Sequence, residues 1–524
     1  MTKKTEAAET SETWVKNIVL TPPSLNDNTA DSDRLAGALK RTLGVDFIEI
    51  DLAMNRMLPD FLRKNEYQVR CVVFKDRERY VLAGVASAFS DETIAGIAVD
   101  LGTSRVVLRL VDLVDGKTIS ETAFDNPQGE IGPDILVRIH FAESEDGLDR
   151  LNRLIVDGLN REIKSLCDKS GISPENVYLI TVAGNTAMTH LFLKLPPRWI
   201  IREPYIPAVN RPGLAKAGEI GLSANPFARV MTFPNIGSYF GGDLIAGILY
   251  SGLNTKEETS VLVDVGTNAE VVLGNENWLI ACAGAAGPAL ESGVTRMGMM
   301  AGPGVIDRVE IDSETKEFTI RTIEDKTPRG ICGSGLIDLA AQLFLAGMMD
   351  IRGKMVRTAC GERYKEIDGL AYLTVVESGE SATGEDLTIN QADLDSLVRS
   401  KAAMFTILET ITGAVGMSAT ELARFYVAGT FGSFINPRSA ISIGMLPDLP
   451  LESYQAIGNS SLGGASMVLT HPDALDRIDQ IRDRITYMEL NVNQDFMNRF
   501  SAAKFIPHTD PAKFPSVAEK IELN

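Results

Sequence analysis

The sequence is poor in cysteine and histidine, and both shortages exclude metal-binding classes. Its five cysteines are scattered over 524 residues and form no C-x-x-C pair, so no local spacing for zinc or an iron–sulfur cluster exists. A cluster assembled from four distant cysteines is the alternative. The four histidines form no H-x-x-x-H or H-E-x-x-H pattern. We therefore expect reduced thiols, a cytoplasmic location and no iron–sulfur cluster in this chain.

Long apolar runs and basic clusters are also missing. No segment approaches the roughly 18 consecutive apolar residues of a membrane helix, and the polar start MTKKTEAAETSET has no apolar run behind its lysines. The chain has 51 basic and 70 acidic residues, a formal net charge of -19, and no Lys/Arg-rich run. A nucleic-acid binder would need cations to neutralise phosphates. We therefore expect neither a membrane nor a nucleic acid among its partners.

The composition, 44% hydrophobic and 23% charged, is that of a globular protein long enough for several domains. Residues 1–30 are polar and are predicted to be a linker or tail. Residues 31–92 are predicted to form a small α+β middle domain, with a helix at 32–44 and strands at 68–74 and 79–86. Over residues 93–524, β-branched runs alternate with helical patterns, which favours an α/β architecture.

An internal echo is the most informative feature of this last region. IAGIAVDLGTSRVVLRLVDL at 94–113 and SVLVDVGTNAEVVLGN at 260–275 share one pattern: an apolar strand, Asp, an apolar residue, Gly-Thr, a polar residue and a second strand. The two aspartates, Asp100 and Asp264, are 164 residues apart (264 minus 100). That interval predicts a duplicated domain rather than a short solenoid repeat.

Each copy of this hairpin has the chemistry of a phosphate site. An aspartate at the end of a buried strand is costly to bury without a cation or several donors. We expect Gly102 and Gly266 to take positive φ, so that the turn points backbone N–H groups at phosphate oxygens. Mg²⁺ favours an Asp beside phosphates. The alternative is an ordinary hairpin in which Asp and Gly serve only the turn. Short polar side chains at the same rim are Thr103, Ser104, Thr267 and Asn268.

A third glycine motif follows the strand predicted at 425–427. In VAGTFG, ending at Gly432, the glycines let a backbone lie against a base or ribose; the alternative is a strand-to-helix connection that uses glycine for close packing. Neither G-x-x-x-x-G-K-[ST] nor a G-x-G-x-x-G that follows a strand and opens a helix is present, which disfavours a P-loop or Rossmann site.

These motifs resemble the superfamily of acetate and sugar kinases, heat-shock chaperones and actin. DLGTS at Asp100 and DVGTN at Asp264 resemble its two phosphate loops, VAGTFG its adenosine motif, and DLIAGILYSGL its first connecting helix. The resemblance implies a duplicated, actin-like ATPase (RNase H-like) domain of two lobes, at about 93–255 and 256–524, preceded by the small α+β domain. It also implies ATP and Mg²⁺ as cofactors.

The chain resembles more specifically the reductive activators of corrinoid-dependent enzymes. The segments that carry this resemblance are PPSLNDNTADSDRL, NPQGEIGPDILVRI, VAGNTAMTHLFL, FGGDLIAGIL, DVGTNAEVVL, AAGPALESG, GICGSGLID, IGNSSLGGA and AKFIPH. Such activators use ATP to return the cobalamin-type cobalt of a methyltransferase system's corrinoid protein from Co(II) to Co(I). Members usually carry an N-terminal [2Fe-2S] ferredoxin-like domain, and this chain begins at what resembles the linker after it.

The resemblance leaves three functions open. The first is an ATP-dependent activator that binds a corrinoid protein and takes electrons from a separate donor such as ferredoxin. The second is a chaperone-like clamp on a corrinoid protein without redox activity, and the third is a small-molecule phosphotransferase. Whether the protein forms a homodimer is open too.

Motif matching assigns roles to individual residues. Asp100, Asp264 and Glu270 are the predicted catalytic residues; Glu270 would orient a water for hydrolysis, although strand alternation could equally aim it at solvent. Asp100, Asp264 and Asp243 are the predicted metal residues, with an ordinary acid at a helix start as the alternative for Asp243. Asn185 either lines the predicted nucleotide-binding cleft or caps the start of a helix. The predicted nucleotide-binding residues are Gly102, Thr103, Ser104, Gly266, Thr267, Asn268, Gly429, Thr430 and Gly432.

Overall fold

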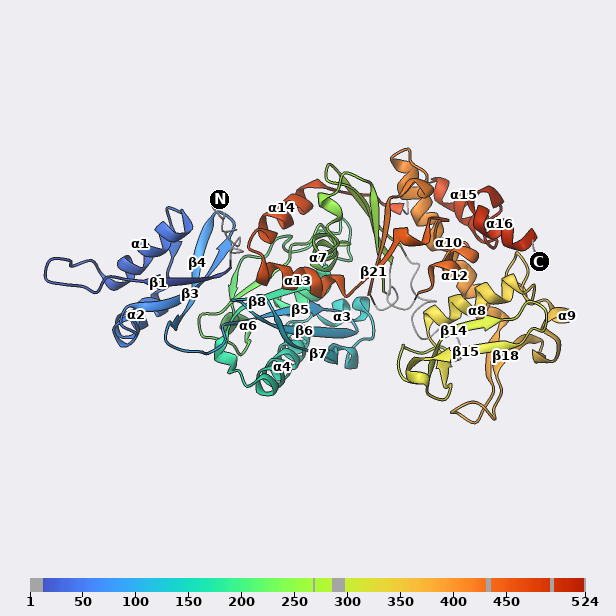
Figure 1. The fold of residues 1–524 in the computed structure, drawn as a ribbon, viewed down its shortest axis with the longest axis horizontal. Helices are drawn as coiled ribbons and strands as arrows, with labels where there is room; N and C mark the ends of the chain where they lie inside the picture. Colours follow the sequence, from blue (N-terminus) through green and yellow to red (C-terminus); the bar gives the residue numbers. More distant parts are fainter. Residues whose placement is uncertain (1–12, 267–268, 285–296, 430–434, 491–493, 523–524) are drawn as a thin grey trace, which may run out of the picture. The chain divides into compact units, whose positions relative to one another are not determined.

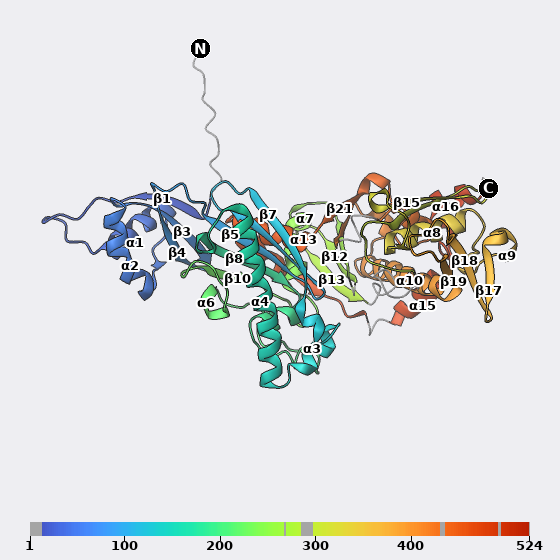
Figure 2. The same cartoon turned by 90° about the horizontal axis from the view of Figure 1, so that it is seen from below.

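The chain folds into two compact units in a computed structural model that describes residues 13–266, 269–284, 297–429, 435–490 and 494–522. Unit 1 comprises Met1–Tyr250 and Ser460–Asp483, and unit 2 comprises Ser251–Asn459 and Arg484–Asn524. Figures 1 and 2 show the elements of each unit in two views.

Unit 1 begins with a small α+β domain, the blue part of Figure 1. Its sheet has the order β1-β3-β4-β2, in which β3 pairs antiparallel with β1 and β4, and β2 pairs parallel with β4. The elements are β1 (Val15–Val19), α1 (Asp31–Leu43), β2 (Ile48–Glu49), α2 (Leu52–Lys64), β3 (Gln68–Asp76) and β4 (Arg79–Ser87). The predicted helix and both predicted strands are confirmed.

Local sequence signals explain these helices. Both bury an apolar stripe, including Leu35 and Leu58, against the sheet. Helix α1 ends at Gly44, whose left-handed backbone suits glycine, and α2 begins at Asp51, whose carboxylate accepts the Met54 N–H. Strand β1 lies in the range predicted as linker or tail. The side chains of β1 show little alternation of apolar and polar residues. Its extended conformation depends on pairing with β3.

The larger sheet of unit 1 has the order β7-β6-β5-β8-β10-β9. Strands β5, β6 and β7 form an antiparallel meander, and β8 and β10 add in parallel on the other side of β5. The strands are β5 (Ala95–Leu101), β6 (Arg105–Asp112), β7 (Thr118–Asp125), β8 (Val177–Gly184), β9 (Ala215–Lys216) and β10 (Arg229–Thr232), and the helices are α3 (Ile135–Phe141), α4 (Glu145–Ser170), α5 (Thr186–Phe192), α6 (Ala217–Ile220), α7 (Gly242–Ser251), α13 (Ser460–Thr470) and α14 (Ala474–Arg484).

The sheet of unit 2 has the order β21-β20-β11-β12-β13-β22, and its first five strands repeat the arrangement of β10, β8, β5, β6 and β7 in unit 1. Again three strands form an antiparallel meander, and two strands, β20 and β21, add in parallel beside β11. The strands are β11 (Ser260–Val265), β12 (Ala269–Gly274), β13 (Leu279–Gly284), β20 (Arg424–Ala428), β21 (Tyr454–Gly458) and β22 (Ile485–Tyr487). The shared strand order confirms the duplication that the sequence echo predicts.

The rest of unit 2 packs into one hydrophobic core with this sheet. Two three-stranded sheets, of order β15-β14-β16 and β17-β18-β19, complete the strands. These strands are β14 (Val305–Ile311), β15 (Phe318–Thr322), β16 (Gly330–Ile331), β17 (Tyr364–Ile367), β18 (Leu370–Val376) and β19 (Leu387–Asn390), and the helices are α8 (Gly333–Leu345), α9 (Arg357–Cys360), α10 (Gln391–Ala414), α12 (Pro437–Ser442), α15 (Gln494–Ala503) and α16 (Pro515–Glu522).

Helix α13 belongs to unit 1, although its residues fall in the range predicted for lobe two. It covers β5 and β8, and the Thr181 hydroxyl on β8 donates to the Ala465 carbonyl at 2.8 Å. The backbones of α13 and α7 also lie in close contact. A Cβ at Gly464 of α13 would lie 2.2 Å from the carbonyl oxygen of Ala246 in α7. Glycine at this crossing therefore lets two helices approach more closely than side chains allow.

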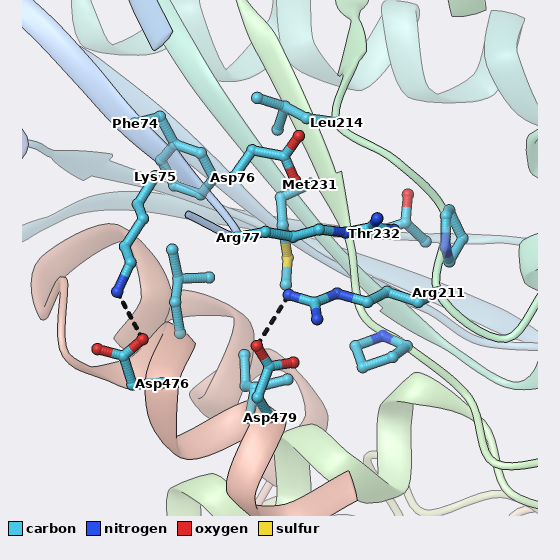
Figure 3. A pocket seen from close by; sticks show the side chains of 14 residues that line it. Phe74, Lys75, Asp76, Arg77, Arg211, Leu214, Met231, Thr232, Asp476 and Asp479 are labelled. Carbon is cyan, nitrogen blue, oxygen red and sulfur yellow. Dashed lines mark hydrogen bonds and ion pairs between the residues drawn. The ribbon is translucent and has the colours of Figure 1, made fainter. Parts of the chain in front are cut away.

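A pocket within unit 1 lies where the small domain meets the larger sheet (Figure 3). Two ion pairs flank it: Lys75 on β3 contacts Asp476 on α14 at 2.6 Å, and Arg211 contacts Asp479 at 2.9 Å. Nearby, the Trp14 indole N–H donates to the Val468 carbonyl at 2.7 Å. None of the predicted site residues lines this pocket. The contacts of Lys75 and Trp14 therefore join the small domain to α14 and α13.

Candidate nucleotide site

The first hairpin places Asp100 at the carboxyl end of β5. Along this strand Ile97, Val99 and Leu101 face the core beneath α4, so the alternating residues Ala98 and Asp100 face the side covered by α13. Asp100 is half-buried there, and in the parallel register it lies beside Ala183 of β8. The carboxylate therefore sits at the edge where β5 and β8 both end.

The reason for glycine at position 102 differs from our expectation. Gly102 is not among the residues with positive φ in the described part of the chain. Instead, a Cβ there would lie 2.2 Å from the Arg105 carbonyl oxygen. The turn therefore requires glycine because two backbone segments approach closely, and the prediction of a left-handed backbone at Gly102 is wrong.

Residues at the starts of α5 and α7 lie beside this turn. Asn185 caps helix α5, where its oxygen accepts the Met188 N–H at 2.9 Å and its amide donates to the Thr103 hydroxyl at 3.0 Å. Asp243 lies in the first turn of α7. A Cβ at Gly241 would be 2.3 Å from the Asn185 Cα and 2.6 Å from an Asp243 carboxylate oxygen. Asn185 and Asp243 therefore lie next to each other, close to Thr103.

Two further residues, Asn126 and Arg138, donate hydrogen bonds to the carbonyls of the turn. Asn126 donates from its amide to the Gly102 carbonyl at 2.9 Å and from its backbone to the Ser104 carbonyl at 2.8 Å. Arg138, on α3, donates to the Thr103 carbonyl at 2.8 Å. Burial lowers the pKa of the Arg138 guanidinium, and the Asp134 carboxylate opposes that shift.

Unit 2 presents the second hairpin with a pair of acids. Asp264 on β11 pairs directly with Glu270 on β12, so both carboxylates lie on the same face of the sheet. The register places Glu270 on the face of Asp264, and its role in orienting a water stays a prediction. Gly266 follows β11 and is half-buried, and like Gly102 it is not among the described glycines with positive φ, so that expectation is wrong here too. The predicted residues Thr267 and Asn268 lie outside the described residues.

The third motif begins beside Asp264. Gly429 follows β20 with φ of 77°, and a Cβ there would lie 3.2 Å from an Asp264 carboxylate oxygen. The positive φ favours glycine, and the Asp264 carboxylate leaves little room for a Cβ. The predicted residues Thr430 and Gly432 lie outside the part of the chain that the structure describes.

A second echo, which the sequence analysis missed, ties the motifs together. Val182-Ala183-Gly184 follows the first hairpin, and Val427-Ala428-Gly429 follows the second. In the sheets, Asp100 lies beside Ala183 and Asp264 beside Ala428 in the same parallel register. Repetition of the letters V-A-G was the signal available. Asn126 and Arg138 were missed too, although both lie in the matched segment NPQGEIGPDILVRI.

The residues present fit a nucleotide-borne magnesium ion. Among the described residues no three His, Cys, Asp or Glu side chains form a group that could hold a metal by themselves. A nucleotide-borne Mg²⁺ would need only one or two carboxylates from the protein, because waters and phosphates would supply its other ligands. The neighbouring acids Asp264 and Glu270 meet that demand.

Comparisons with known proteins agree over almost the whole chain. Protein-family models match residues 4–92 ("RACo linker region"), 95–256 ("RACo middle region") and 258–518 ("C-terminal domain of RACo the ASKHA domain"). A solved structure titled "Reductive activator for corrinoid,iron-sulfur protein" is 36% identical, with 98% of this chain and 82% of that chain covered and a TM-score of 0.86.

Two curated relatives carry corresponding names. The "Corrinoid activation enzyme RamQ" of Eubacterium limosum is 29% identical over 424 residues, which are 79% of this chain and 71% of that protein. The "[Co(II) methylated amine-specific corrinoid protein] reductase" of Methanosarcina barkeri is 23% identical over 438 residues, 77% of this chain and 75% of that protein. The chain therefore belongs to the RACo family of reductive activators for corrinoid proteins.

Proposed function

We propose that this protein is an ATP-dependent enzyme that binds a corrinoid protein and promotes the reduction of its cobalt from Co(II) to Co(I). The observation that carries the proposal is the duplicated sheet with an acid in the same register of both copies, in a chain similar along 98% of its length to a reductive activator. The proposed location is the cytoplasm, because all five cysteines are free thiols.

The proposed nucleotide contacts come from both hairpins. In unit 1 the proposed phosphate contacts are Asp100, Gly102, Thr103 and Ser104. In unit 2 they are Asp264, Gly266, Thr267 and Asn268. Gly429 would begin the adenosine side. Mg²⁺ would neutralise phosphate charge beside Asp264 and Glu270 in unit 2, and Asp100 and Asp243 are the proposed metal residues of unit 1. Glu270 lies on the face where it could orient an attacking water.

The proposed redox step is a one-electron transfer. A separate donor, such as a reduced ferredoxin, loses one electron and the Co(II) of the corrinoid protein gains it, which forms Co(I). ATP can drive this step only if it binds the states of the activator and its partner with different affinity, because a ligand shifts an equilibrium by its differential binding free energy alone.

A spectroscopic assay tests the proposal. The protein, its corrinoid partner, reduced ferredoxin and Mg·ATP are mixed under anaerobic conditions, and the visible spectra of Co(II) and Co(I) are followed. We expect Co(I) to accumulate only when ATP and the protein are both present. An unchanged cobalt spectrum with ATP-dependent partner affinity would instead identify a clamp without redox activity. A phosphorylated small molecule would identify a phosphotransferase.

A further inference from the structure

Arg138 is a buried cation that contacts the turn of the first hairpin and residues packed beside that turn. Only 1% of the residue is exposed. Its guanidinium donates to the carbonyls of Gly132 and Thr103, both at 2.8 Å, and to the Gln128 side-chain oxygen at 3.4 Å. Among the described residues it has no ion pair. A buried charge held only by neutral acceptors is costly, and a helix anchor alone does not require one.

The contacts behind the turn include every carbonyl of the three-residue loop. The Gly102 and Ser104 oxygens accept from Asn126, and the Thr103 oxygen accepts from Arg138. Both donor side chains also contact the sulfur of Met188, at 3.8 Å and 3.5 Å. Asn126 and Arg138 therefore lie side by side, and the three carbonyls point towards one place.

Peptide planarity turns this arrangement into an anion cradle. In a trans peptide the C=O of one residue points opposite to the N–H of the next. Carbonyls fixed at the back of the loop therefore direct the N–H groups of Thr103 and Ser104 to the front. Among the described contacts, neither of these two N–H groups donates to another part of the chain. Adjacent N–H groups with a common direction bind phosphate oxygens.

We propose that Arg138 and Asn126 are positioning residues that hold the first phosphate loop in its anion-binding conformation, and that the fixed charge of Arg138 raises the loop's affinity for nucleotide phosphates. This inference rests on the proposed function of the site. The side chain of Arg138 reaches phosphate only through Thr103. A structural role would stabilise the fold alone, whereas a positioning role sets phosphate affinity.

Paired measurements of ATP and adenosine affinity separate these roles. Isothermal titration of the full chain with Mg·ATP and with adenosine gives a ratio of dissociation constants. For Arg138→Met we expect ATP to bind at least about tenfold more weakly while adenosine affinity stays within about twofold, because adenosine carries no phosphate. Arg138→Lys keeps the charge but not the forked donors, and should fall between the wild type and Arg138→Met.

Arg229→Met is the matched control. Arg229 is also a buried arginine of unit 1, 4% exposed, but its contacts lead to Asp51 and the Phe227 carbonyl. Its loss should destabilise the fold and leave the ratio unchanged. If Arg138→Met does not fold, Asn126→Ser is the alternative variant. It removes the hydrogen bond from the Asn126 side-chain amide to the Gly102 carbonyl and should shift the ratio in the same direction.

The outcomes separate this inference from the proposed function. A wild-type protein that binds no ATP would overturn the proposed function. If the wild type binds ATP but Arg138→Met and Asn126→Ser keep its ratio of ATP to adenosine dissociation constants, the positioning role is overturned. The proposed function is unaffected by that result. An equal loss of ATP and adenosine affinity would also overturn the positioning role, because that result marks general damage to the site.

Discussion

Replacing Gly102 by alanine should damage the first phosphate loop while most of the fold persists. The added Cβ would meet the Arg105 carbonyl oxygen at 2.2 Å, and ordinary contact begins near 3.4 Å. The hairpin must therefore open by about 1.2 Å, the difference between these distances. Overpacking of this kind costs about 1–3 kcal/mol. The carbonyl of Gly102 itself accepts from Asn126, so this opening disturbs the loop's support as well.

Nucleotide affinity is the readout that reports on the loop. We expect Mg·ATP to bind Gly102→Ala at least tenfold more weakly, which corresponds to about 1.4 kcal/mol. Thermal unfolding with and without Mg·ATP measures the effect, since a ligand that binds only the folded state raises its stability. Gly129→Ala is the control, because a Cβ there meets nothing within 4 Å and the residue has no positive φ.

Two results would refute the reasoning. Gly102→Ala that binds Mg·ATP with wild-type affinity would show that the turn does not form the phosphate site. Equal losses in Gly102→Ala and Gly129→Ala would show that the close approach to Arg105 does not cause the effect.

Three further predictions concern unit 2 and the helix crossing. Asp264→Asn should lower Mg·ATP affinity and hydrolysis at least tenfold with a wild-type circular dichroism spectrum, since it removes charge without volume; full hydrolysis would contradict the proposed role. Gly464→Ala should lower the free energy of unfolding by about 1–3 kcal/mol, because its Cβ would meet the Ala246 oxygen at 2.2 Å; unchanged urea unfolding would count against the crossing. Lys401 is fully buried, and burial lowers its pKa to about 7. Between about pH 7 and pH 10.5 the unfolded chain therefore binds more protons than the folded chain. The free energy of unfolding, measured relative to that of Lys401→Met, should rise with pH in this window. A difference that stays constant or falls would refute the lowered pKa of Lys401.

Local sequence patterns were sufficient for the strands that carry the site. An apolar run followed by Asp and Gly-Thr predicted β5 and β11, because strand alternation and turn residues act over a few positions. The same reasoning found α1, β3 and β4 in the small domain. It did not find β1, whose conformation depends on pairing with β3 some 50 residues later.

Contacts between distant residues were beyond these patterns. No local pattern links Arg138 to Thr103, since β6 and β7 separate the first turn from α3 in the chain. The sequence could not place Glu270 on the face of Asp264 until the register of β11 and β12 was known. It also assigned α13 to the range of lobe two, whereas the helix packs on the sheet of unit 1.

The sequence by itself determined that this protein contains two related sheets and that each has an aspartate near the end of one strand. Those features follow from residue spacing along short segments. Only the tertiary structure decided why Gly102 must be glycine, and which side chains stand behind the first turn. Backbone distance and burial arise from the packing of elements far apart in the chain, and no local pattern encodes them.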